Sequence, residues 1–211
     1  MDRWTFGVEP LPQAVQAAAL LRRLTGLILA LEGEQPEMDR LILELQAVEG
    51  SLGSRIPPDP TPRVGAAAPG DGRVYLDHAR HIGAYNPSFP EYDIVVDGDR
   101  AHGSVTFPLP YEGPPGIVHG GFLAVFFDCA VQHHNCDVGV AGRTTSLSVR
   151  YRKPTPLLTP LAFTIGRTVS EGRIRSVGTL FLDERILCNA EVDAIAADRA
   201  ALPEVSPREI P

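Results

Sequence analysis

The spacing of apolar residues divides the chain into a part with helical periodicity and a later part with β periodicity. Within residues 12–31, leucine recurs at every third or fourth position, as Leu20, Leu24, Leu27 and Leu31. Within residues 36–52, the same spacing is kept by Leu41, Leu45, Val48 and Leu52. Apolar residues at this spacing share one face of a helix, and Pro36 suits a first helical turn. The sequence therefore predicts an N-terminal helical hairpin over residues 1–56.

Runs with the composition and period of β-strands follow residue 73. Residues 92–96 and 102–107 flank Asp97-Gly98-Asp99, which is typical of a hairpin turn. Four more runs cover residues 143–151, 161–169, 174–181 and 186–195. Between the second and third runs, residues 122–132 are almost entirely apolar, as in a buried helix. We predict an α+β fold in which an antiparallel sheet, ending in a four-stranded meander, encloses one central helix.

Proline and glycine mark the boundary between these two parts. Residues 57–72 contain five prolines and three glycines, a composition typical of an extended linker. The predicted domains are the helical hairpin (1–56), this linker (57–72), the sheet-and-helix domain (73–200) and a C-terminal tail (201–211).

The segment before the apolar helix carries the candidate chemistry. It reads Glu-Gly-Pro-Pro-Gly-Ile-Val-His-Gly-Gly over residues 112–121. The amides of Gly120 and Gly121 would open the helix, where backbone N–H groups lack intrahelical acceptors and favour an anion or an oxyanion. Further along, Asp128 interrupts the apolar run, and a buried carboxylate is unfavourable unless it has partners or a chemical role.

The distance between these groups predicts a site shared by two subunits. From Gly121 to Asp128 the helix rises about 10 Å, at 1.5 Å per residue. One carbonyl group cannot contact both ends of that span. If both groups serve one reaction, one of them comes from a second copy of the chain. We therefore predict a homodimer with active sites at its interface, with a dimer of dimers as a further possibility.

The same residues resemble a known family. Val118-His119-Gly120-Gly121 followed by Asp128, then residues 144–151 and Arg152-Lys153-Pro154, is similar to the hotdog-fold acyl-CoA thioesterases of the PaaI-like branch. The similarity covers roughly residues 83–196 and leaves the N-terminal helices outside it. It implies a hotdog fold and the hydrolysis of an acyl-CoA thioester to a free acid and CoA.

The resemblance also implies roles for single residues. The amide of the middle glycine, here Gly120, would polarise the thioester carbonyl, and the motif histidine, here His119, would shape that pocket. The helix acid, here Asp128 reaching in from the second subunit, would act as general base or as nucleophile. A hydroxyl on the following strand, here Thr144, would position the water. Some members carry Asn six residues before the histidine, where this chain has Gly113, so that contact stays unassigned.

Six residues are candidates for substrate binding: Gly113, Gly121, Thr145, Arg150, Arg152 and Lys153. Thr145 is included because a one-residue change of strand register would exchange its place with that of Thr144. The three basic residues fit the phosphates of CoA through charge-assisted hydrogen bonds. They equally fit a solvated strand edge, so both interpretations stay open.

Two other groups of reactive side chains are interpreted as structural. His133-His134, with Cys136 and Asp137, ends the helix, but neighbouring helical side chains point about 100° apart and are poor co-ligands. We expect no metal there, because the attraction of positive charge to a helix C-terminus accounts for the histidines. Cys129 lacks an evident base and is expected to pack in the core. No cofactor is expected other than the CoA of the substrate.

Composition limits the classes of partner and the cellular location. The net charge of −7 over 211 residues argues against a nucleic-acid-binding or anionic-membrane surface. Three cysteines without framework spacing indicate a reducing compartment. Neither a signal peptide nor a membrane span is predicted, so we expect a cytoplasmic protein.

Two alternative functions remain open at this level. A non-catalytic acyl-CoA sensor would also join N-terminal helices to a hotdog domain. Residues 1–70 hold six arginines against nine acidic residues, which disfavours a DNA-reading sensor. A hotdog acyl-thioester dehydratase ranks lower, because such enzymes carry a different Asp/His motif.

Overall fold

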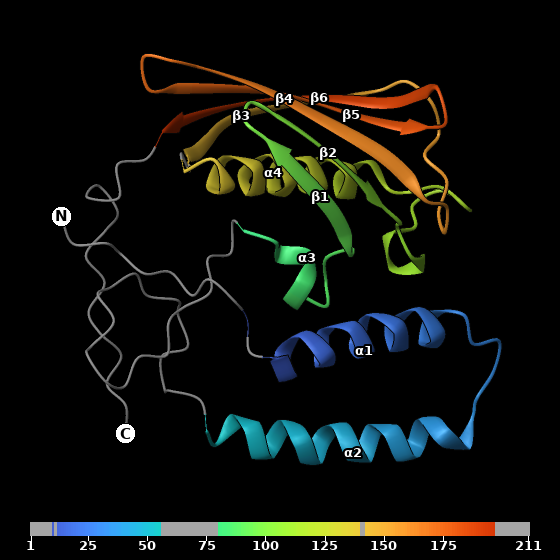
Figure 1. Ribbon diagram of the computed structural model, residues 1–211. Coiled ribbons are helices and arrows are strands. Elements are labelled where there is room, and N and C mark those ends of the chain that lie inside the picture. The colour runs from blue at the N-terminus through green and yellow to red at the C-terminus, as the bar shows by residue number, and fades with distance from the viewer. Residues whose placement is uncertain (1–9, 11, 56–79, 140–141, 197–211) are drawn as a thin grey trace.

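The computed structural model of the protein describes residues 10, 12–55, 80–139 and 142–196 (Figure 1). Its main element is a six-stranded sheet in the order β1-β2-β4-β5-β6-β3, in which every pair of neighbours is antiparallel. The strands are β1 (Tyr92–Asp97), β2 (Arg100–Val105), β3 (Gly142–Tyr151), β4 (Leu161–Ser170), β5 (Arg173–Leu182) and β6 (Arg185–Ala196). The predicted linker and C-terminal tail lie outside the described residues.

One long helix, α4 (Gly120–Asp137), lies along the concave face of the sheet (Figure 1). Phe126 and Phe127 on this helix are fully buried against the sheet. Gly178 on β5 makes this packing possible, since a Cβ there would lie 2.5 Å from the ring of Phe127. The predicted architecture, a sheet wrapped around a central apolar helix, is therefore confirmed.

The place of β3 differs from the prediction. The predicted meander holds for β4, β5 and β6, each of which pairs with the next. β3 instead pairs with β6, because β2 occupies the free edge of β4. Residues 152–160, which include three prolines, connect β3 to β4 without continuing either strand. β3 consequently forms one edge of the sheet.

The two N-terminal helices are present, and they differ in how they contact the rest of the protein. Helix α1 (Pro12–Leu29) packs against two short elements that were not predicted, α3 (Ile82–Tyr85) and the 3₁₀ turn η1 (Leu109–Tyr111). These elements separate α1 from α4 (Figure 1). Helix α2 (Pro36–Gly53) lies outermost in the figure and buries none of its residues.

The buried face of α1 is not the predicted leucine face. Leu20 and Leu27 are 50% and 65% exposed, whereas Ala18 and Arg22 are the buried residues of this helix. Helical periodicity identifies an apolar stripe, but it does not say whether this chain covers that stripe. The hydrogen bonds of Arg22 with the loop before β1 decide which face of α1 turns inward.

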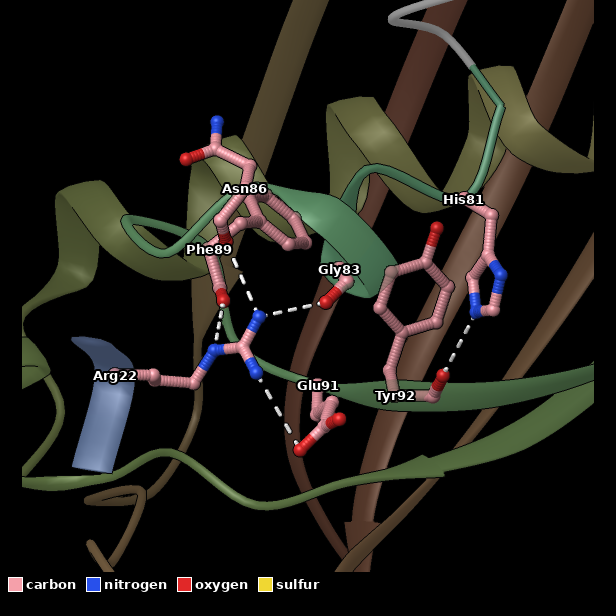
Figure 2. Close-up of polar contacts among 7 residues, drawn as sticks. All are labelled: Arg22, His81, Gly83, Asn86, Phe89, Glu91 and Tyr92. Atoms are coloured by element: carbon pink, nitrogen blue, oxygen red, sulfur yellow. Dashed lines mark hydrogen bonds and ion pairs between the residues drawn. The ribbon is translucent and has the colours of Figure 1, made fainter. Parts of the chain in front are cut away.

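The Arg22 guanidinium connects α1 to that loop (Figure 2). Its Nε donates to the carbonyl of Phe89 at 2.8 Å, and one Nη donates to those of Gly83 at 2.7 Å and Asn86 at 3.1 Å. The other Nη lies 3.4 Å from a carboxylate oxygen of Glu91. A buried guanidinium is unfavourable without partners, and here several partners surround it.

Arg22→Met is expected to lower the free energy of unfolding by about 2–3 kcal/mol, because buried carbonyls lose a charged donor. Chemical denaturation followed by circular dichroism measures this change. The matched control is Arg23→Met, at the exposed neighbouring position, with an expected effect of about 0.5 kcal/mol or less. Equal destabilisation by both variants would contradict the role assigned to Arg22.

Within the described residues, no helix combines the length and the apolar character needed to cross a membrane.

Candidate active site

The loop that leads into α4 is closed by its own hydrogen bonds. The amide of Gly116, at φ +74°, donates to the Glu112 carboxylate at 2.7 Å. The amide of Gly113 donates to the Ile117 carbonyl at 2.8 Å. A Cβ at Gly113 would lie 2.9 Å from Cα of His119, so an Asn, which some members of the resembled family carry there, does not fit without a shift of the loop. Only the backbone atoms of Gly113 are available for the predicted contact with the substrate.

His119 caps the N-terminus of α4. Its backbone is extended (φ −64°, ψ 131°), and its Nδ1 accepts the amide hydrogen of Gly121 at 3.0 Å. This contact changes the expectation for Gly121, whose amide is occupied by the imidazole. Only the amide of Gly120, in the first helical turn, is left as the predicted donor to an oxyanion.

Tyr151 closes one side of this helix terminus. Its hydroxyl donates to the Gly120 carbonyl at 2.8 Å. A Cβ at Gly120 would lie 2.9 Å from the tyrosine ring, so a larger residue here would displace the Tyr151 side chain. Nothing in the sequence predicted this contact of Tyr151 with the helix terminus.

Asp128 lies partly buried in the middle of α4, two turns beyond Gly120. The Thr144 hydroxyl on β3 donates to its Oδ1 at 2.7 Å. The predicted pair of acid and hydroxyl is therefore brought together within one chain. Gly120 and Asp128 remain about 12 Å apart along the helix, at 1.5 Å per residue.

A β-bulge decides which threonine reaches the acid. Thr144 pairs with Ala194 and Ser146 pairs with Asp193, so Thr145 has no partner in the ladder. Without the bulge, alternation would place Thr144 on the outer face with Ser146. The bulge turns it inward instead, opposite the buried Ala194. Thr145 points away from the acid and donates to the carbonyl of Asp193 at 3.1 Å.

The three predicted basic residues lie at the exposed end of β3 and just beyond it. Arg150 and Arg152 help to line a shallow hollow across β3, β5 and β6, and Arg152 donates to the Asn189 side chain. The amide of Lys153 donates to the Leu187 carbonyl at 3.0 Å. These residues are thus grouped, but away from the inner-face contact between Asp128 and Thr144.

Cys129 follows Asp128 and has the environment of a structural thiol. Burial, assisted by the neighbouring carboxylate, raises the pKa of Cys129 to about 11. A thiol with this pKa is almost entirely protonated at neutral pH, whereas a nucleophilic cysteine must be a thiolate. This environment agrees with the predicted packing role.

The histidines at the end of α4 are engaged with protein groups. The Tyr92 hydroxyl lies 2.8 Å from Nδ1 of His133, whose Nε2 lies 3.5 Å from Asp137. Burial lowers the pKa of His133 to about 4, in spite of the opposing effect of Asp137. His133 is therefore neutral near pH 7, and the prediction that positive charge explains its position is wrong. His134 contacts the Gly98 carbonyl at 2.8 Å.

In the part of the chain that the structure describes, no cluster of three or more His, Cys, Asp or Glu side chains has the arrangement of a metal site.

The chain was compared with protein-family models and with solved structures. No family model matches the chain. The structure is similar to that of a thioesterase superfamily protein with 27% identity and a TM-score of 0.70, over 90% of this chain and 97% of that one.

Two further solved structures are similar to about half of this chain. A phenylacetic acid degradation-related protein from Ralstonia eutropha JMP134 has 18% identity over 50% of this chain and 84% of its own, with a TM-score of 0.46. A hypothetical thioesterase from Streptococcus pneumoniae TIGR4, solved with coenzyme A, has 18% identity over 52% and 88%, with a TM-score of 0.49. The chain thus has the hotdog fold of thioesterase superfamily proteins, preceded by two helices.

Proposed function

We propose that this chain, which has the hotdog fold of thioesterase superfamily proteins, hydrolyses acyl-CoA thioesters. The observation that carries the proposal is the pair formed by Asp128 and Thr144 at 2.7 Å, a carboxylate held within the apolar run of α4. The similarity to a thioesterase superfamily protein along nearly the whole chain supports the same class of reaction.

The chemistry follows from three groups. Asp128 takes a proton from water, and the oxygen of that water attacks the thioester carbonyl carbon. The amide of Gly120 and the positive end of the helix dipole stabilise the negative charge that develops on the carbonyl oxygen. The tetrahedral species then expels CoA as a thiolate, which takes up a proton. In the alternative path, Asp128 attacks the carbonyl itself and water hydrolyses the resulting anhydride.

The proposed enzyme is a homodimer or a dimer of dimers. Gly120 and Asp128 of one chain are too far apart to serve one carbonyl, so the donor and the acid come from different subunits. Two features of the chain favour such an interface. β3 is an edge strand of ten residues with an open row of backbone groups. Phe122 and Val125, which share the Asp128 side of α4, are 38% and 50% exposed.

The basic group at the end of β3 is the proposed site for the phosphates of CoA. Arg150 and Arg152 line a hollow that also contains Ser148, Asn189 and Glu191, whose carboxylate is paired with Arg175. Guanidinium groups bind phosphate through paired, charge-assisted hydrogen bonds.

A panel of acyl-CoA esters with short, long, branched and aromatic acyl groups tests the proposal. Release of CoA, followed with a thiol reagent, is expected to exceed the uncatalysed rate by at least about a million-fold for the preferred ester. Binding of these esters without thiol release would contradict hydrolysis and favour the acyl-CoA sensor.

A further inference from the structure

Two buried carboxamides follow Asp128 on α4. Gln132 is 8% exposed and Asn135 is fully buried, although the rest of this helix is largely apolar. They lie four and seven residues after the acid, on the same side of the helix. A buried amide is unfavourable unless its donors and acceptors are satisfied, so the partners of these two groups need an explanation.

The two amides join Asp128 to a buried arginine through one row of hydrogen bonds. Arg167 Nη1 lies 3.3 Å from Asn135 Oδ1, and Asn135 Nδ2 lies 3.4 Å from Gln132 Oε1. Gln132 Nε2 then lies 2.9 Å from the Thr144 hydroxyl, which lies 2.7 Å from Asp128 Oδ1. The row therefore reaches the acid through the Thr144 hydroxyl.

Arg167 at one end and the Asp128 carboxylate at the other fix the direction of the bonds in this row. A guanidinium group only donates hydrogen bonds, so the Asn135 oxygen faces Arg167 and its NH₂ faces Gln132. Gln132 consequently accepts with its oxygen and donates with its NH₂ to the Thr144 oxygen. With its oxygen engaged in this way, the Thr144 hydroxyl turns its hydrogen toward the acid.

Arg167 itself is held in place from the other side. Its Nε donates to the Asp99 carboxylate at 2.9 Å, and its amide donates to the Asp99 carbonyl at 3.0 Å. Its side chain is 7% exposed. The origin of the row is therefore anchored at the turn between β1 and β2, remote from the proposed reacting atoms.

We infer that Gln132 and Asn135 are positioning residues that hold the Thr144 hydroxyl in the orientation in which it donates to Asp128, and so hold one carboxylate oxygen in place. The second carboxylate oxygen then takes the proton of the attacking water. This inference rests on the proposed hydrolysis of acyl-CoA thioesters.

Asn135→Asp tests the inference by exchanging donors and acceptors in the row of hydrogen bonds. Aspartate has nearly the same size, and it accepts from Arg167 but cannot donate to Gln132. The Gln132 side chain is then expected to turn its NH₂ toward the new carboxylate and its oxygen toward Thr144, so that the hydroxyl loses its donor and meets an acceptor that competes with Asp128. We expect kcat to fall about tenfold with KM unchanged, while the thermal melting curve stays cooperative.

A double-variant cycle separates this role from a structural one. Thr144→Val removes the hydroxyl through which the row acts, so Asn135→Asp is expected to change kcat by less than about twofold in that background. Gln132→Met, which breaks the row without adding charge, provides the same comparison should Asn135→Asp fail to fold.

The outcomes distinguish this inference from the proposed function. Wild-type kcat in the Asn135→Asp and Gln132→Met variants, or independent effects of Asn135→Asp and Thr144→Val, would overturn the positioning role alone. Absence of turnover by the wild-type protein on every ester of the panel would overturn the proposed function, and the positioning role with it.

Discussion

Asp128→Asn is expected to lower kcat by about 100- to 10,000-fold, the range that a positioned general base contributes. Asparagine has the shape of aspartate, and its side-chain oxygen still accepts the Thr144 hydroxyl. It neither takes a proton from water nor attacks a thioester. The expected loss is therefore chemical, and the fold and the binding of the substrate should be retained. Thiol release under saturating acyl-CoA measures kcat directly.

The control for this experiment is the residue next in sequence. Cys129→Ala removes the neighbouring thiol, whose pKa of about 11 disqualifies it as a nucleophile. Its activity is expected to stay within about threefold of wild type, a change of less than 1 kcal/mol in the barrier. Turnover near the wild-type rate by Asp128→Asn would remove the acid from the mechanism, and loss of turnover in Cys129→Ala would implicate the thiol.

Removal of the amide hydrogen at Gly120 is the second change with a large expected effect. Gly120→Pro deletes the donor, and loss of one oxyanion donor typically lowers kcat about 100- to 1000-fold. Proline is tolerated at the first helical position, and the extended backbone of His119 suits a residue that precedes proline. Because any side chain at this position meets Tyr151, the substitution is made in a Tyr151→Ala background.

The Tyr151→Ala variant alone is the reference for that measurement. It loses one hydrogen bond to the helix terminus but keeps the Gly120 amide, so a far smaller loss of activity is expected. Equal activity in the single and the double variant would show that the Gly120 amide does not contact the developing charge.

Mixing the two inactive proteins tests the shared site. The Asp128→Asn chain keeps the donor, and the Gly120→Pro, Tyr151→Ala chain keeps the acid. Random pairing during co-expression makes about half of the dimers mixed, and one of the two sites in each mixed dimer is intact. About a quarter of all sites should therefore be active. No recovery of activity in a sample shown to contain mixed dimers would mean that each subunit carries its own site.

Much of the fold follows from local pattern. The alternation of residues along each strand, the Asp97-Gly98-Asp99 turn and the apolar run of α4 predicted the element order and the α+β architecture. These signals depend on residues close in sequence, and the structure confirms them. The pairing of β3 with β6 could not be predicted in this way, because it depends on which edge β2 leaves open.

In the candidate site, too, some features follow from local sequence and others depend on the tertiary structure. The residues of the motif, from Val118 to Gly121 with Asp128 beyond, predicted the type of site and the acid within it. Whether Thr144 or Thr145 meets that acid depends on a bulge, which exchanges the two faces of the strand. The occupation of the Gly121 amide by His119 is equally a matter of side-chain orientation.

The sequence by itself therefore determined the long helices and the strands, together with the apolar run that Asp128 interrupts. Tertiary structure alone decided that Arg22, and not the leucines, turns inward on α1, and that Gln132 and Asn135 join Asp128 to Arg167. The physical reason is that periodicity records which residues share a face. The partner of each face, and the direction of each buried hydrogen bond, are set by groups far away in sequence.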